Sequence, residues 1–327
     1  MSTHNLTFRS AIRSALREEL ARDSRVFLIG EDIGDAGGVY KVTEGLLAEF
    51  GPERVIDTPI SETAIIGAAL GSSITGLIPI AEIMFSDFTM IAMDQICNQA
   101  AKKSYLSGGR ERAGFVVRAV TGAGVSFGPQ HSQSLEAWFA HTPGLVSILP
   151  SNPRDARGLL RSAVHLGKPT IFFEHKTLYP TEGSVPEEEE LIPVGKCETK
   201  RIGEDITIVS AGAPVRECER AAETLATSGI SAELVDIRTL SPLDFDTISH
   251  SVEKTGRLLI VEEDVGFCGW GAEIAAQTAE QLLYSLKSPI VRIAAPYTPI
   301  PFSPVLEKAY LPQAQTVTGT ARKMMSG

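Results

Sequence analysis

The sequence has few cysteines and too little positive charge to balance its acids. Its 327 residues include 4 cysteines that stand far apart without C-x-x-C spacing, which excludes the common zinc patterns and favours a reducing compartment. With 30 Lys and Arg against 40 Asp and Glu, the formal net charge is −10. This balance argues against nucleic-acid binding, because a phosphate-binding surface needs clustered Lys and Arg. The longest acidic run, Glu187–Glu190, is typical of a solvated linker.

Several targeting and binding signals are also missing. No apolar run approaches the roughly 18 residues of a membrane span, so we expect no membrane association. The N-terminal residues pass directly into an amphipathic helix that contains Glu18 and Glu19, which speaks against a signal or transit peptide and favours the cytoplasm. There is no G-x-x-x-x-G-K-[ST] loop, and no G-x-G-x-x-G between the first strand and helix.

What the sequence does contain is a repeated alternation of strands and helices. Short β-branched runs predict strands at 26–30, 78–85, 114–120, 145–150 and 170–175, with helices at 8–22, 61–75, 87–104, 134–140 and 153–165 between them. Such alternation predicts an α/β fold with a largely parallel sheet covered on both faces.

A second alternation follows a proline-bearing acidic segment. Strands are predicted at 205–212, 231–240, 257–264 and 289–296, with helices at 214–228, 244–254 and 270–285. We therefore expect two α/β domains, at 1–190 and 191–327, with a linker that begins at about residue 180.

Glu62 is the first candidate for chemistry. Pro59 favours an extended Thr58, and Ser61 is a plausible N-cap, so Glu62 falls in the first turn of the next helix. The helix dipole alone would favour an acidic residue there. However, AIIGAALG contains only apolar and small residues, so we expect this helix to be buried on every side, where an unpaired carboxylate needs a partner.

Three further features have simple structural explanations when taken singly. The glycines of TGAGVSFG are typical of an ordinary turn, and a lone loop histidine such as His131 usually makes a surface hydrogen bond. Phe85 and Phe88 follow a predicted strand, where aromatic residues most often belong to the core.

Taken together, these residues resemble a known family. The motifs occur in this order: GED (30–32), GGVYKVTEGL (37–46), RVIDTPISE (54–62), AEIMFSDF (81–88), DQICNQAAK (94–102), QHSQS (130–134), PSNPRDARGLL (150–160), IFFEHKTLY (171–179), DIRTLSPLD (236–244) and APYTPIPFS (295–303). Over essentially its whole length, the chain resembles the beta subunit of the thiamine-diphosphate-dependent decarboxylating component of 2-oxo acid dehydrogenase complexes. The resemblance implies a transketolase-type pyrimidine-binding domain followed by a transketolase-like C-terminal domain.

The resemblance also implies roles for four residues. Glu62 matches the glutamate that binds a ring nitrogen of the aminopyrimidine and controls its tautomer, so that the cofactor acts as its own base. Phe88 matches the aromatic residue that stacks on this ring, and His131 matches a histidine near the reacting carbon. Glu31 corresponds to an acidic residue that lines a polar channel between paired active sites in some members.

The other half of the cofactor site is missing from the sequence. Family members hold the diphosphate through Mg²⁺ and a GDG motif, which this chain lacks. Since a hard cation that bridges phosphates needs oxygen ligands, the resemblance implies that an alpha subunit supplies them in an α2β2 heterotetramer that docks on a lipoyl acyltransferase core. Relatives also carry a structural potassium ion near the position of Ala163, Leu166 and Lys168. Lys168 brings a positive charge there, which argues against the ion unless its ligands are backbone carbonyls.

The substrate stays open between pyruvate, acetoin and a branched-chain 2-oxo acid, with EHKTLYP and the QHSQ loop favouring the acetoin type slightly. The expected reaction uses the cofactor carbanion to decarboxylate a 2-oxo acid or cleave acetoin and then reductively acylates a lipoyl group. The alternatives are a split transketolase-like carboligase subunit and a non-catalytic scaffold subunit.

Overall fold

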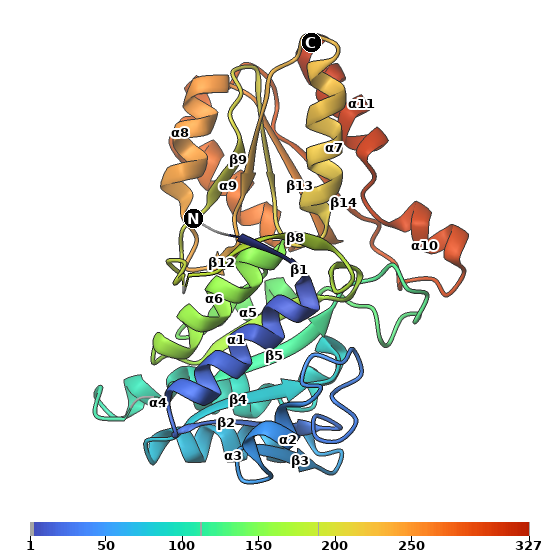
Figure 1. The fold of residues 1–327 in the computed structure, drawn as a ribbon. Helices are drawn as coiled ribbons and strands as arrows, with labels where there is room; N and C mark the ends of the chain where they lie inside the picture. Colours follow the sequence, from blue (N-terminus) through green and yellow to red (C-terminus); the bar gives the residue numbers. More distant parts are fainter. Residues whose placement is uncertain (1–2, 112, 189, 327) are drawn as a thin grey trace. The chain divides into compact units, whose positions relative to one another are not determined.

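The computed structural model describes residues 3–111, 113–188 and 190–326. Contacts divide the chain into two compact units (Figure 1). Unit 1 comprises Met1–Thr121 and Trp138–Val194, and unit 2 comprises Gly122–Ala137 and Gly195–Gly327. The sequence predicted a single domain boundary near residue 190. In the structure, Gly122–Ala137 belongs to the same unit as the C-terminal half of the chain.

Unit 1 is built on a parallel sheet with the strand order β6-β7-β5-β4-β2-β3. These strands are β2 (Val26–Glu31), β3 (Val55–Thr58), β4 (Ile78–Ile83), β5 (Val116–Thr121), β6 (Val146–Ile148) and β7 (Thr170–His175). The strands near the centre are buried along most of their length, which is why they appear in the sequence as continuous apolar runs.

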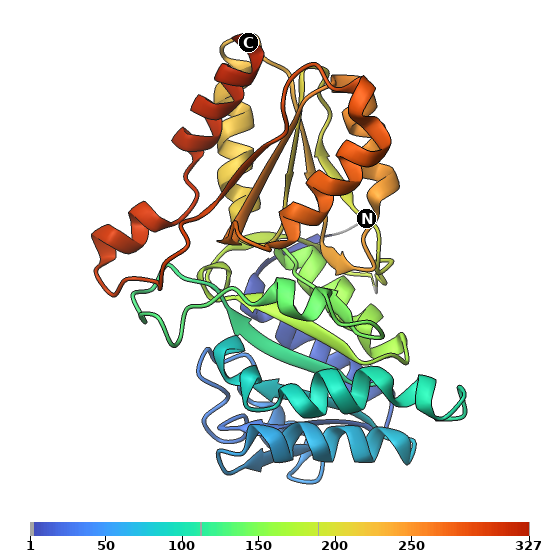
Figure 2. The same cartoon turned by 180° about the vertical axis from the view of Figure 1, so that it is seen from behind.

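Helices cover both faces of this sheet. On one face α1 (Phe8–Arg22) packs against α6 (Pro153–His165), and α3 (Glu62–Ile74) lies with η2 (Asp94–Ala100) and α4 (Ala101–Leu106) on the other (Figures 1 and 2). The predicted bounds of α1 and α6 are confirmed. Both helices are capped by side chains: the Thr7 hydroxyl accepts a hydrogen bond from Ser10 N, and the Asn152 side chain accepts one from Asp155 N.

The single helix predicted over 87–104 was wrong in its continuity. The chain instead forms the 3₁₀-helix η1 (Ser86–Met90), the π-helix η2 and the α-helix α4. The three segments have only 5, 7 and 6 residues, which is too short for a change in residues per turn to show in the apolar pattern. A short helix α2 (Leu46–Phe50) was not predicted.

The prediction of a linker that begins at about residue 180 was also wrong in part. Residues Glu182–Pro186 form β8, which pairs antiparallel with β1 (Thr3–Thr7). Pairing between residues so far apart in the sequence leaves no local signal, and the glycine and proline in this segment are typical of loops.

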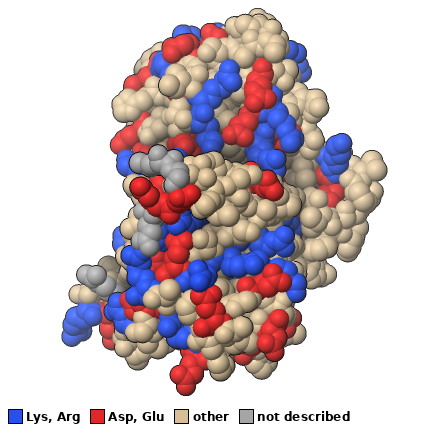
Figure 3. All heavy atoms as spheres, in the orientation of Figure 1, with Lys and Arg blue, Asp and Glu red and all other residues tan. Residues whose placement is uncertain are grey.

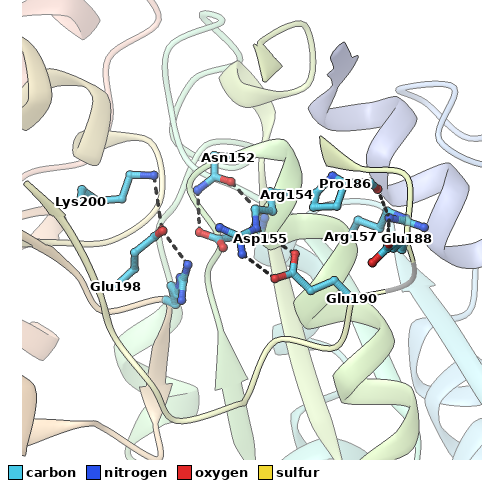
Figure 4. A network of polar contacts seen from close by, with 10 residues as sticks. Asn152, Arg154, Asp155, Arg157, Pro186, Glu188, Glu190, Glu198 and Lys200 are labelled. Atoms are coloured by element: carbon cyan, nitrogen blue, oxygen red, sulfur yellow. Dashed lines mark hydrogen bonds and ion pairs between the residues drawn. The ribbon is translucent and has the colours of Figure 1, made fainter. Parts of the chain in front are cut away.

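The acidic run that follows β8 is held against α6 rather than fully solvated. Figure 4 shows Arg154 facing Glu190, with 2.8 Å between Arg154 Nε and Glu190 Oε2. Arg157 donates from the same helix to the carbonyl oxygens of Pro186 at 2.8 Å and Glu188 at 3.3 Å. Glu189, within the expected linker, lies outside the described residues. Elsewhere on the face seen in Figure 3, basic and acidic side chains are interspersed.

Unit 2 has its own sheet, in the order β14-β13-β10-β11-β9. Its strands are β9 (Glu198–Arg201), β10 (Ile206–Ser210), β11 (Ala232–Asp236), β13 (Leu258–Val265) and β14 (Val291–Ala295). The four predicted strands of this sheet pair in parallel, whereas the unpredicted β9 runs antiparallel to β11. A short strand, β12 (Thr239–Ser241), follows β11.

The helices of unit 2 cover its sheet from both sides (Figures 1 and 2). The covering helices are α7 (Pro214–Ala226), α8 (Phe245–Thr255), α9 (Trp270–Leu282) and α11 (Ala314–Ser326), whereas α10 (Pro304–Tyr310) projects away from the sheet. A buried cluster joins α7 and α11 to the strands of one face, and α8 packs beside α9. No helix among the described residues is long and apolar enough to cross a membrane.

A buried ion network joins three neighbouring strands of unit 1. Arg118 on β5 lies between Glu82 on β4 and Glu174 on β7. The Arg118 Nε and Nη2 atoms donate to the two carboxylate oxygens of Glu174 at 2.6 and 2.9 Å, and the Tyr179 hydroxyl donates to Glu174 at 2.8 Å. Arg118 is 2% exposed and Glu174 is fully buried. Burial raises the pKa of Glu82, so its charge depends on the arginine that opposes this shift.

Removing the arginine from this network is expected to destabilise unit 1. An Arg118→Leu substitution leaves buried carboxylates without their cation, which costs about 3–5 kcal/mol when one partner of a buried pair is lost. Urea unfolding at neutral pH, followed by circular dichroism, measures the change. Arg25→Leu is the control, since Arg25 pairs with Asp23 at the surface and such pairs contribute about 1 kcal/mol or less. Equal effects from the two substitutions would contradict a structural role for the network.

Candidate active site

Glu62 is the first residue of α3 and is 8% exposed. Ser61 occupies the N-cap position as predicted, but its side chain makes no capping hydrogen bond. Within the described chain, we find no hydrogen-bond or ion-pair partner for the Glu62 carboxylate. The structure therefore presents a nearly buried acidic group at a helix N-terminus whose hydrogen-bonding capacity is unused.

The expectation that α3 is buried on every side was wrong. Its inner face buries Ile65, Ile66, Ala69 and Leu70 against the sheet. The outer face exposes small residues: Thr63, Ala64, Ala68 and Gly71. The sequence did not separate the two faces because small residues on one and aliphatic residues on the other give almost no amphipathic contrast.

Glu31 lies close to Glu62. It is the last residue of β2 and is paired in register with Thr58 at the end of β3, three residues before the cap of α3. The pKa of Glu31 is raised by burial and by the negative charges of Asp32, Glu62 and Asp57. The carboxyl ends of β2 and β3 thus gather acidic groups that a hydrogen-bond donor or a positive charge would stabilise.

Phe88 belongs to the same edge of the unit 1 sheet. It lies on η1, directly after β4, and β4 is the neighbour of β2. Its ring meets Phe85 edge-on at 5.7 Å, and Phe85 in turn meets Tyr40 edge-on at 6.5 Å. The Lys176 ammonium lies 5.2 Å from the Phe85 ring centre. Phe88 is partly exposed, so its orientation is set by this aromatic cluster while part of its ring stays accessible.

The sequence did not predict that Tyr40 and Lys176 belong to this cluster. Tyr40 stacks on Tyr179 with ring centres 4.7 Å apart, and burial raises the pKa of its hydroxyl to about 12. Lys176 is 2% exposed. Both belong to motifs that distinguish the sequence, but only the fold brings them to Phe85.

His131 belongs to unit 2, in the segment Gly122–Ala137. It is partly buried, and its backbone N–H donates to the Gly128 carbonyl at 3.4 Å. The structure thus brings Glu31, Glu62 and Phe88 to one edge of unit 1 and places His131 in a loop of unit 2.

The loop before His131 also contains the sequence motif of a nucleophilic serine. Gly124-Val125-Ser126-Phe127-Gly128 matches G-x-S-x-G, and Ser126 has a φ of +60°. A nucleophile elbow lies on a sharp turn from a strand into a helix. Here the residues on either side are irregular, and the Ser126 hydroxyl donates to Glu307 at 3.1 Å. Ser126 therefore lacks the surroundings of an acyl-transfer nucleophile.

The region of the expected potassium site is the C-terminal end of α6. The Ala163 carbonyl accepts a hydrogen bond from Leu166 N at 3.3 Å, and Lys168 is exposed beyond it. Within residues 3–111, 113–188 and 190–326, no group of three or more His, Cys, Asp or Glu side chains is arranged to hold a metal ion.

A second group of acidic residues lies at the end of β13 in unit 2. Asp264 follows Glu262 and Glu263, and its backbone neighbour Val265 donates its N–H to the Asp264 carboxylate at 2.7 Å. Burial and the nearby charge of Glu136 raise the pKa of Asp264 to about 8, with smaller contributions from Glu262 and Glu263. Asp264 is therefore an acid that the fold favours in its neutral form.

Comparison with known families defines the class of this chain. Residues 4–182 match the transketolase pyrimidine-binding domain, and residues 195–317 match the transketolase C-terminal domain. A solved split-gene transketolase described as an inactive beta4 tetramer has the same fold, with a TM-score of 0.81 and 23% identity over 98% of both chains. The chain is thus a transketolase-like α/β protein with a pyrimidine-binding domain followed by a C-terminal domain.

More similar relatives narrow this class. The chain is 47% identical to the acetoin:2,6-dichlorophenolindophenol oxidoreductase subunit beta of Cupriavidus necator, over 98% of both chains. It is 45% identical to the pyruvate dehydrogenase E1 component subunit beta of Bacillus subtilis, and 44% identical to that organism's 2-oxoisovalerate dehydrogenase subunit beta, again over 98% of both chains. The chain belongs to this family of acetoin and 2-oxo acid dehydrogenase beta subunits, which are thiamine-diphosphate-dependent oxidoreductases.

The protonation of Asp264 is expected to make stability depend on pH. Its pKa is about 8 in the folded state, and close to 3.8 in the unfolded chain. Between these values the unfolded state has released a proton that the folded state retains, so stability falls as pH rises from about 4 to 8 and this contribution then levels off. Asp264→Asn removes the ionisation, and its urea midpoint should vary less between pH 5 and pH 8 than that of the wild type. An unchanged pH dependence would contradict the raised pKa.

Proposed function

We propose that this chain is the beta subunit of a thiamine-diphosphate-dependent dehydrogenase component of the pyruvate or acetoin type. With an alpha subunit, it decarboxylates a 2-oxo acid or cleaves acetoin and transfers the acyl group reductively to a lipoyl group. The observation that carries the proposal is Glu62: a nearly buried carboxylate without a partner in the described chain, at the sheet edge to which Glu31 and Phe88 also belong.

The residues at this edge fit the aminopyrimidine end of the cofactor. The unused acceptor atoms of Glu62 suit a protonated ring nitrogen of the cofactor. The acidic residues around Glu31 raise its pKa, so a ligand that brings a hydrogen-bond donor suits this edge better than one that brings another negative charge. The partly exposed ring of Phe88 offers an aromatic face for stacking. When bound, thiamine diphosphate supplies the nucleophilic carbon and the electron sink that acyl-group chemistry requires.

Each residue of the chain then has a limited task. Glu62 holds a proton at the ring nitrogen and thereby controls the tautomer of the neighbouring amino group. Glu31, whose pKa is raised mainly by burial, is suited to retaining or passing a proton in the polar channel that joins paired sites. His131 acts near the reacting carbon, where it binds substrate and the incoming lipoyl group.

The diphosphate and its Mg²⁺ belong to the alpha subunit in this proposal. The chain has no GDG motif, and among the described residues no group of three or more His, Cys, Asp or Glu side chains is arranged to hold a metal ion. We therefore propose an α2β2 heterotetramer in the cytoplasm that docks on a lipoyl acyltransferase core. A potassium ion near Ala163, Leu166 and Lys168 would have to use backbone carbonyls, because Lys168 brings a positive charge.

The isolated chain is expected to bind thiamine diphosphate weakly and to be inactive. Co-expression with the alpha subunit should give turnover of pyruvate, of a branched-chain 2-oxo acid or of acetoin, measured by reduction of 2,6-dichlorophenolindophenol. The preferred substrate in this panel decides between the two proposed types. Robust turnover by the beta chain alone would contradict the shared site.

Replacing Glu62 by glutamine is expected to leave folding intact and to lower kcat. Proton exchange by a positioned group contributes about 10²–10⁴-fold, so Glu62→Gln in the assembled complex should lose activity in this range while keeping its thermal midpoint. The matched control is Glu53→Gln, which neutralises an exposed glutamate of the same unit. A rate near that of the wild type in Glu62→Gln would remove Glu62 from the mechanism.

A further inference from the structure

Two carboxylates hold the loop that carries His131. Glu307 accepts hydrogen bonds from Gly124 N at 2.8 Å and from Ser126 N at 2.9 Å, besides the bond from the Ser126 hydroxyl. Glu263 accepts a bond from Ala123 N at 2.7 Å and one from the Ser134 hydroxyl at 3.3 Å. The loop is therefore held on both sides of His131 by residues that lie far away in the sequence.

Glu307 is the more buried of these two anchors. It lies on α10 and is 3% exposed. We find no Lys, Arg or His paired with it among the described residues, so the loop's own N–H and O–H groups stabilise its charge. Hydrogen bonds to an ionised acceptor are about twice as strong as neutral ones. Each partner thus depends on the other, because loop N–H groups and a buried carboxylate both cost free energy when left unpaired.

The conformation of the loop suits this arrangement. Gly124 and Ser126 have φ values of +105° and +60°, and their N–H groups converge on one carboxylate as the N–H groups of an anion-binding backbone nest do. Gly128 follows with φ +74°, and a Cβ atom there would lie 2.4 Å from the Phe302 ring. The turn from Gly128 to His131 therefore begins at a fixed point. The Phe302 ring lies against Gly128, and Glu307 binds the backbone two residues before it, at Ser126.

We propose that Glu307 is a positioning residue for His131. Its carboxylate fills the nest formed by Gly124 and Ser126 and so fixes the backbone from which the His131 turn extends. This inference rests on the role of His131 in the proposed function. Glu307 itself touches the loop backbone and the Ser126 side chain, so its effect on the reaction passes through the histidine.

The test uses the beta chain co-expressed with its alpha subunit and compares three variants with the wild type. Glu307→Ala is expected to lower kcat by about 10–10²-fold, the loss that a displacement of about 1 Å produces, with the KM for thiamine diphosphate unchanged. Glu307→Gln keeps one acceptor oxygen and should recover part of the rate. Hydrogen exchange at the amides of Gly124 and Ser126 should become faster in Glu307→Ala. The control is Glu280→Ala, an exposed glutamate on α9 that should change none of these values.

A double mutant separates positioning from other effects. In a His131→Ala background, adding Glu307→Ala should cause no further loss of kcat. The effects of two substitutions on the rate are not additive when one residue acts through the other. The same fold-loss in both backgrounds would overturn the positioning role while leaving the proposed function intact. A wild-type rate for His131→Ala alone would instead remove the histidine from the proposed function, and the inference with it. If Glu307→Ala does not fold, the comparison is made with Glu307→Gln.

Discussion

Parallel pairing of β2, β3 and β4 is the constraint on which the candidate site depends. Parallel strands end at the same edge of a sheet. The residues that follow these three strands therefore lie close together although they are distant in sequence. Glu31 comes from the end of β2, Glu62 from the helix after β3, and Phe88 from the turn after β4. The ion network centred on Arg118 then ties β4 to β5 and β7 from within, so the edge is built on a sheet that resists sliding.

The same edge illustrates how burial and charge are balanced at the candidate site. A fold selected only for stability would not leave the Glu62 carboxylate nearly buried, near other acids and without a partner among the residues that the structure describes. Burial and the charges of neighbouring acids, Glu62 among them, raise the pKa of Glu31 for the same reason. The proposed cofactor ring would stabilise the Glu62 carboxylate by supplying a donor, which is a physical reason for assigning the site to this edge.

Much of the fold was predictable because strong local patterns determine it. The α/β class, the helices α1 and α6 and the buried strands follow from apolar periodicity, and their prediction is confirmed. The pair β1 and β8, the antiparallel β9 and the division of 87–104 into three helical types were missed. These features depend on partners distant in sequence or on hydrogen-bond spacing, neither of which a single stretch of sequence records.

The site was predictable to a different degree. Glu62, Phe88, His131 and Glu31 were selected by their resemblance to family motifs, and their roles stay predictions until the variants are measured. The supporting residues could not be selected in this way. Glu307 stands in PVLEKAY, a segment with no sequence signal of its function, and only the folded chain brings it to Gly124 and Ser126.

The grouping of Gly122–Ala137 with unit 2 has a practical consequence for dissecting the protein. A gene divided at the apparent border near residue 190 would express the histidine loop with the first fragment and both anchoring glutamates with the second. Neither fragment would retain the loop in its native conformation, because the loop and its two anchors would lie on different chains. Studying the halves in isolation would therefore give a misleading picture of the histidine, however well each half folds.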